Sequence, residues 1–188
     1  MSDQKIRKPR ADALRNREHI LAVAQALFAE EGPNVTLDDV VRRSGLGVGT
    51  LYRHFPTRDA LVEALYLSEL EKLVVAEQEL AKTHPPVEAL RAWMILFLDL
   101  IATKISIKEA LSAMVGGTDA LYAKSGEMLR STMTSLTDRA VAAGEIRLEF
   151  EPLDLLRAIS GVAMASPDSN WHENARRMVD VLIAGMRI

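Results

Sequence analysis

The amino-acid sequence predicts an all-α protein in which three short helices are followed by a bundle of six helices. Apolar residues recur at intervals of three and four along most of the 188 residues, which is the period of an amphipathic helix. Glycine, proline and helix-capping residues separate these periodic segments. Only residues 145–150 alternate in the manner of a strand, and this stretch is too brief to predict a sheet.

The composition is that of an ordinary folded protein, and it narrows the possible chemistry. Hydrophobic residues make up 48% of the chain and charged residues 26%, which argues against disorder. There is no cysteine, so disulfides, thiolate zinc sites and cysteine nucleophiles are excluded. The first residues are charged, and the longest apolar run, residues 92–102, contains Asp99 and is too short to cross a bilayer. We therefore expect a cytoplasmic protein with no membrane partner.

The first three helices are predicted from one apolar stripe and a series of breaks. The first helix covers about four turns and ends at Gly32 and Pro33. Thr36 can cap a short second helix, which stops at residues 44–45, and a third runs from about residue 47 to Pro56. The stripe of the first helix consists of Ile20, Val23, Ala24, Leu27 and Phe28.

The six later helices are predicted in the same way. Two of them have expected side-chain caps, because Ser106 and Asn170 each precede a glutamate by three residues. The helices are expected at residues 57–81, from residue 86 or 87, from about residue 106, at residues 118–143, from residue 152 to residues 166–168, and after residue 170.

Charge is distributed unevenly along the chain. The first 17 residues hold six basic and two acidic side chains, a net charge of +4, so the remainder carries −7 because the whole chain carries −3. A basic end on an acidic body favours a polyanion as the partner of that end. The alternative is a solvated leader without a partner. We interpret residues 1–16 as a basic arm in which Arg7, Lys8 and Arg10 contact DNA.

The segment that follows predicts a helix-turn-helix unit. Two short helices joined at Gly45 form such a unit when apolar side chains fix their crossing. This packing leaves Val48, Gly49, Tyr52 and Arg53 on the outer face of the second helix, with His54 at its edge. The expected inner contacts join Leu37, Val40 and Val41 to Leu46, Leu51 and Phe55.

The side chains of this outer face suit the major groove of DNA. A guanidinium can bind guanine or phosphate, a phenol or imidazole can bind phosphate, and valine can contact a thymine methyl group. Arg58, in the first turn of the next helix, is placed for another phosphate. Tyr52 could instead be half-buried, and His54 could bond a neighbouring carbonyl. The predicted DNA contacts of this unit are Thr36, Gly47, Val48, Gly49, Thr50, Tyr52, Arg53, His54 and Arg58.

The sequence "TLDDVVRRSGLGVGTLYRHF", followed by "PTRDAL", resembles the DNA-binding domain of TetR-family transcriptional repressors. With the preceding "ILAVAQALFAEEGPNVTL", the resemblance covers residues 17–64. Val41 replaces the usual alanine, Gly47 a usual serine and Val48 a frequent lysine. The last two changes remove a hydroxyl cap and a cation. The C-terminal half resembles the SbtR-like branch of that family.

The resemblance implies a homodimer that binds a palindromic operator through two recognition helices, with the last two helices of each chain forming the interface. The regions expected to meet are the small residues Ala158, Gly161, Val162 and Ala165 and the apolar residues Leu182, Ile183 and Met186. The alternative is that both regions face the core of the monomer. Two recognition helices, one from each subunit, are needed because one short helix binds DNA too weakly to specify a site.

The resemblance also implies that residues 65–188 form a dimerisation domain that binds a small-molecule effector. Asp99 interrupts an apolar helix, so it either needs a partner such as a ligand cation or lies on the wet face beside Lys104 or Arg91. Apolar side chains at helical spacing can equally be plain core. The candidate lining residues are Trp93, Met94, Phe97, Asp99, Met114, Tyr122, Met128, Met133 and Met164.

An enzyme and a carrier protein are the competing classes. The chain has no glycine-rich phosphate loop, nucleophile elbow or metal motif, and its four histidines are scattered. We therefore expect no catalytic residue, metal or cofactor. A helical carrier that binds small molecules but not DNA remains the alternative, although it leaves the basic arm and the run from Tyr52 to His54 without a role.

Overall fold

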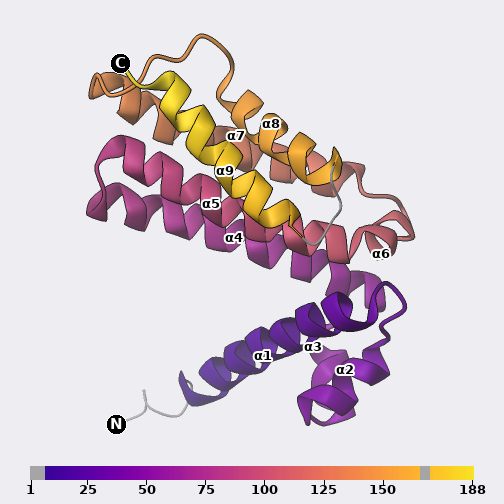
Figure 1. Cartoon of the computed structure of the whole chain (residues 1–188). Helices are drawn as coiled ribbons and strands as arrows, with labels where there is room; N and C mark the ends of the chain where they lie inside the picture. Colours follow the sequence, from indigo (N-terminus) through magenta and orange to yellow (C-terminus); the bar gives the residue numbers. More distant parts are fainter. Residues whose placement is uncertain (1–6, 166–169) are drawn as a thin grey trace, which may run out of the picture. The chain divides into compact units, whose positions relative to one another are not determined.

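The computed structural model describes residues 7–165 and 170–188, and within these ranges the chain is almost entirely helical (Figure 1). In the described ranges, the one β-type pairing is an isolated antiparallel bridge between Ile146 and Arg187. The all-α prediction is confirmed. The described residues form nine helices, which are α1 (Arg7–Glu31), α2 (Leu37–Ser44), α3 (Val48–His54), α4 (Arg58–Thr83), α5 (Pro86–Ser106), α6 (Lys108–Ser112), α7 (Asp119–Ala142), α8 (Pro152–Ala165) and α9 (Trp171–Met186).

The chain divides into two compact units, Met1–Tyr66 with Thr103–Thr118, and Leu67–Ala102 with Asp119–Ile188. Helices α4 and α5 therefore each contribute to both units. A hydrogen bond from Gln25 in α1 to Thr103 in α5, 2.9 Å long, lies within the first unit. The sequence-based division at residue 64 assigned residues 103–118 to the bundle, because it followed chain order rather than contact in space.

Helix α1 is longer than the sequence predicted. It has 25 residues and begins at Arg7, whereas a helix of about four turns after residue 17 was expected. Seven of residues 7–16 are arginine, alanine, lysine or leucine, which favour helices. Pro9 is tolerated because it lies in the first turn, where its missing N–H costs no hydrogen bond. The described part of the basic arm is thus helical.

The first unit has the core that a helix-turn-helix requires. Gly45 closes α2 with φ +68°, a left-handed conformation that glycine adopts without steric cost. Val41 and Leu46 are half-buried, so they line the edge of the core. The residues that fill its centre are Ile20, Ala24, Leu27, Phe28, Leu37, Val40, Leu51 and Phe55.

The second unit is held together by hydrogen bonds from side chains to helix carbonyls. The buried Trp93 in α5 donates from Nε1 to the carbonyl of Leu73 in α4, at 2.8 Å. Arg139 in α7 donates to the carbonyl of Ala81, near the end of α4, also at 2.8 Å. These bonds join α5 and α7 to α4. No helix in the described ranges combines the length and the apolar character that crossing a bilayer requires.

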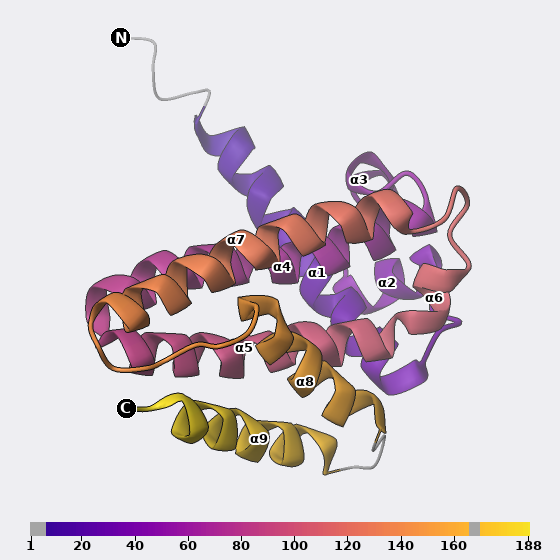
Figure 2. The ribbon, with the colours of Figure 1, turned by 90° about the horizontal axis from the view of Figure 1, so that it is seen from above.

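Helices α8 and α9 run side by side in both views (Figures 1 and 2). Ion pairs also join α9 to α5, with Arg91 Nε 2.6 Å from Asp180 Oδ1. On α9, Ile183 and Met186 are 3% and 6% exposed, so they pack in the core of the monomer rather than facing a partner. On α8, Ala158, Gly161 and Ala165 are exposed.

Of two predicted caps, Ser106 is wrong and Asn170 is confirmed in position only. Ser106 is the last residue of α5, where its hydroxyl donates to the carbonyl of Thr103. The N-cap position of α6 is instead held by Ile107, which makes no side-chain cap bond. Asn170 holds the N-cap position of α9 but makes no side-chain cap bond. The predicted helix end at residues 166–168 lies outside the described residues.

We expect Trp93→Phe to lower the free energy of unfolding by about 2–4 kcal/mol, because it removes a buried hydrogen bond and leaves a cavity. Trp171→Phe is the matched control, since Trp171 is only half-buried, and it should cost less than about 1 kcal/mol. Urea unfolding followed by circular dichroism measures both. Equal losses in the two variants would contradict the assigned role of Trp93.

Candidate nucleic-acid interface

Helix α2 begins with a reciprocal cap between Thr36 and Asp39. The Thr36 hydroxyl accepts from the backbone N–H of Asp39 at 3.2 Å and donates to Asp39 Oδ2 at 2.6 Å. The backbone N–H of Thr36 donates to the same carboxylate at 2.9 Å. The side-chain and backbone hydrogen bonds from Thr36, followed by the charge of Arg42, lower the pKa of Asp39. The Thr36 hydroxyl is therefore engaged within the protein, where it fixes the start of α2.

Helix α3 has a buried face and an exposed face. Leu51 is 0% exposed and Phe55, directly after the helix, is 1% exposed. Val48 and Tyr52 are 56% and 41% exposed, and Gly49 and Arg53 are exposed with them, while Thr50 and His54 are half-buried. The predicted separation of inner and outer residues is confirmed, and contact of the outer face with DNA stays a prediction.

The start of α3 leaves its backbone accessible. Gly47 is the N-cap, and it makes no side-chain cap bond. A Cβ atom at Gly47 or at Gly49 would meet no neighbouring atom within 4 Å. The packing of the protein itself therefore does not require glycine at either position, and the space beside the first turn of α3 is open to a partner.

Tyr52 has a partner on α2 that the sequence did not indicate. Its hydroxyl donates to Asp38 Oδ1 at 3.4 Å, across 14 residues of sequence. Asp38 was explained from sequence only by its place in the first turn of α2, where an acidic residue favours the helix dipole. The outer face of the unit thus carries a carboxylate beside a phenol.

Two residues of α1 support the helix-turn-helix from behind. The guanidinium of Arg17 lies 4.8 Å from the ring centroid of Phe55, a cation–π contact. His19 Nε2 donates to the carbonyl of Ser44 at 3.0 Å, at the last residue of α2. Neither was predicted as a site residue, although Arg17 lies one turn before Ile20 and so shares its helix face.

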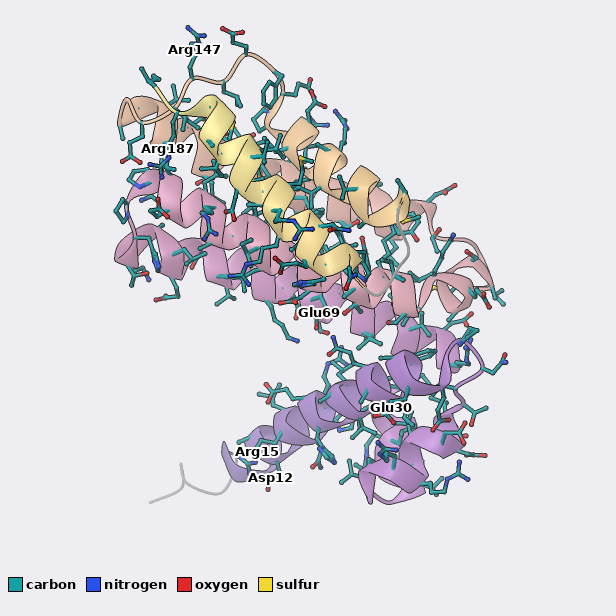
Figure 3. All side chains as sticks on the ribbon, in the orientation of Figure 1. Asp12, Arg15, Glu30, Glu69, Arg147 and Arg187 are labelled. Atoms are coloured by element: carbon teal, nitrogen blue, oxygen red, sulfur yellow. The ribbon has the colours of Figure 1, made fainter. Side chains whose placement is uncertain are left out.

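Three arginines of this unit, Arg15, Arg42 and Arg43, are paired with carboxylates. Arg43 reaches Glu30 at 3.0 Å, and Arg15 pairs with Asp12 in the first half of α1, where Figure 3 labels both. In the described part of the chain, the Arg53 side chain has no such partner. Arg53 is therefore the cation of α3 that is available to an incoming anion.

Arg58 differs from its predicted role. Its Nε donates to the carbonyl of Val35 at 2.8 Å and its Nη2 to the carbonyl of Pro33. Its guanidinium also lies 5.6 Å from the ring centroid of Phe28. These contacts direct the side chain into the connection between α1 and α2 rather than toward a phosphate. Arg7, Lys8 and Arg10 lie at the start of α1, so these three predicted contact residues belong to one helix.

The predicted effector residues do not form one group. Trp93 and Phe97 stack with their ring centroids 6.1 Å apart, whereas Met114 belongs to the other compact unit. The Asp99 side chain is 63% exposed, and its Oδ1 lies 3.9 Å from His172 Nε2. Asp99 is therefore on the solvent-exposed side of α5. Met164 is also exposed; Met114, Tyr122 and Met128 are half-buried; and Trp93, Met94, Phe97 and Met133 are buried.

The fold and the outer face of α3 define a class. A helix-turn-helix whose second helix presents an exposed tyrosine and an exposed arginine, followed by a helical bundle, is the arrangement of a DNA-binding regulator. Residues 20–65 match the family model described as "Bacterial regulatory proteins, tetR family". Residues 85–188 match the model described as "Transcriptional regulator SbtR-like, C-terminal domain". The chain belongs to the TetR family of transcriptional regulators.

Solved and curated relatives agree with this assignment. A TetR transcriptional regulator from Streptomyces coelicolor is 41% identical with a TM-score of 0.80, over 91% of this chain and 98% of that chain. A TetR transcription regulatory protein from Mycobacterium vanbaalenii is 30% identical with a TM-score of 0.76, over 95% and 99%. An HTH-type transcriptional regulator of Staphylococcus aureus is 26% identical over 87% of this chain and 88% of its own. These relatives are regulators rather than enzymes.

We expect Asp39→Asn to destabilise the protein near neutral pH, because the neutral amide accepts the Thr36 hydrogen bonds less strongly. The pKa of Asp39 is lowered from 3.8 in the folded protein. Its stabilisation is therefore fully present above the unfolded pKa and is lost as the pH falls through the folded pKa. Urea unfolding of both proteins should show a constant difference above about pH 5 that shrinks below about pH 4. A difference independent of pH would refute this account of the cap.

Proposed function

We propose that the protein is a cytoplasmic repressor that binds a palindromic DNA operator as a homodimer and is released by a small-molecule effector. The observation that carries this proposal is the exposure of Val48, Tyr52 and Arg53 on a helix whose inner residues are buried. These side chains offer an apolar contact, a hydroxyl and a cation at one surface, which is what a major groove can use. Membership of a family of transcriptional regulators supports it.

Binding by a dimer follows from the size of the recognition helix. Helix α3 has seven residues, about 10 Å of helix, so it can touch only a few base pairs. Two copies related by a two-fold axis can read two half-sites about 34 Å apart, one turn of DNA. A palindromic operator matches that symmetry.

We assign the dimer contact to the exposed side of α8 and α9. Met164 and Val181 are large apolar side chains that are 57% and 62% exposed there. The exposed small residues Ala158, Gly161 and Ala165 would let a second helix approach closely. An apolar surface of this kind is a usual mark of a protein–protein contact.

Effector release would act through α4. This helix has 26 residues and contributes to both compact units. An effector bound among the candidate residues of the bundle, such as Trp93 and Met133, would tilt α4. This tilt would change the separation of the two α3 helices in the dimer. Because the ligand then favours a spacing that the operator does not fit, it lowers the affinity for DNA.

The proposal predicts that Arg53→Ala and Tyr52→Ala each weaken operator binding by about tenfold to a hundredfold. The operator is first selected from a random DNA pool, and affinities are measured by fluorescence anisotropy. Circular dichroism and light scattering should show an unchanged fold and assembly, since both side chains are exposed. Unchanged affinity in both variants would remove α3 as the reading element.

A salt titration distinguishes a DNA-binding regulator from a carrier protein. The logarithm of the affinity for duplex DNA should fall steeply with the logarithm of the salt concentration, because phosphate contacts release counterions. A carrier protein would bind no duplex at any salt concentration, and that result would reject the proposed function.

The dimer contact predicts that Val181→Glu shifts the protein from dimer to monomer, because it places a charge in an apolar interface. Val75→Glu is the matched control, since Val75 on α4 is also 62% exposed. Light scattering over one range of protein concentrations measures both. A dimer that survives Val181→Glu but not Val75→Glu would move the interface elsewhere.

A further inference from the structure

Asp38 is an acidic residue at the surface where the proposed function places DNA. It is exposed, and its Oδ1 lies 3.4 Å from the hydroxyl of Tyr52 on the outer face of α3. An anion beside a phosphate-rich partner is costly. General attraction to DNA therefore does not explain why an acidic residue occupies this surface.

Two other carboxylates of the same unit are paired with arginines, whereas Asp38 is not. Asp39 forms the cap of α2 and pairs with Arg42, and Glu30 pairs with Arg43. In the described part of the chain, Asp38 is bonded through its side chain to Tyr52 alone, and no cation neutralises it. Asp38 therefore has no ion-pair partner there and has, at Oδ2, a free acceptor.

A DNA surface presents two kinds of group to this carboxylate. Phosphate oxygens repel it, whereas the exocyclic amino groups of cytosine and adenine in the major groove can donate to it. The Tyr52 hydroxyl, by donating to Oδ1, holds the carboxylate on the outer face. A carboxylate at this place would therefore distinguish a phosphate from a base edge.

We propose that Asp38 is a specificity-determining residue, which together with Tyr52 penalises DNA registers that place a phosphate beside it and favours those that place a cytosine or adenine amino group there. This inference rests on the proposed function. It predicts that Asp38 lowers the affinity for DNA of unrelated sequence and so increases the ratio of specific to non-specific affinity.

A purely structural role for Asp38 would have a different signature. As an acidic residue in the first turn of α2 it also interacts with the helix dipole. Loss of that interaction would change the stability of the protein and would weaken binding to all DNA by the same factor. The ratio of two affinities is insensitive to such a change.

The test compares the wild-type protein with Asp38→Asn on the selected operator and on a scrambled duplex of equal length and composition. We expect Asp38→Asn to bind the scrambled duplex about fivefold to twentyfold more tightly, because one repulsive charge per subunit is removed. The ratio of specific to non-specific affinity should fall by a similar factor. Asp138→Asn, which changes the net charge equally at an exposed position of α7, should leave the ratio unaltered.

Selection from a random pool provides a second readout. Sites selected by the wild-type protein should hold cytosine or adenine at one position of each half-site, and sites selected by Asp38→Asn should lose that preference. Tyr52→Phe, which leaves α2 untouched, should also lower the affinity ratio because the carboxylate is no longer held in place.

An unchanged ratio in both Asp38→Asn and Tyr52→Phe, or the same base preferences in both selections, would overturn the inference. In either case the wild-type protein would still bind its operator, so the proposed function would stand. Absence of duplex binding by the wild-type protein would instead reject the proposed function itself.

Discussion

The burial of Leu51 and Phe55 is the constraint on which the reading surface depends. Helix α3 has seven residues, far fewer than the roughly 12–15 that a helix needs to persist alone in water. Its stability therefore comes from tertiary packing, with Leu51 and Phe55 at most 1% exposed. Fixing these two side chains also fixes the rotation of the helix about its axis. Tyr52 and Arg53 point outward as a consequence.

The sequence was sufficient for features with a local cause. Apart from the start of α1, breaks at glycine and proline placed the helices to within a few residues, because those residues end helices through their own backbone geometry. The turn at Gly45 followed from the backbone freedom of glycine, and the outward position of Tyr52 from the spacing of the apolar residues around it. The cap at Thr36 was predicted because it is local: its partner, Asp39, lies three residues further on.

Features that join distant parts of the chain were missed. Arg58 contacts carbonyls 23 and 25 residues earlier, and Tyr52 contacts Asp38 across 14 residues, so no periodic pattern marks either pair. Ser106 shows the converse error, since a valid capping spacing was overridden when α5 continued through it. Asp99 stood out in an apolar run, but its exposure depends on which side of α5 the other helices cover.

The first compact unit is discontinuous in sequence, because residues 103–118 belong to it together with residues up to Tyr66. A fragment cut at the end of the family match, residue 65, would keep the helix-turn-helix but lose the partner of Gln25 and the rest of that segment. A chimera that joins this DNA-binding unit to another helical bundle must therefore include both the residues up to Tyr66 and residues 103–118. The segment that matches the family model, residues 20–65, and the first compact unit of the structure therefore have different boundaries.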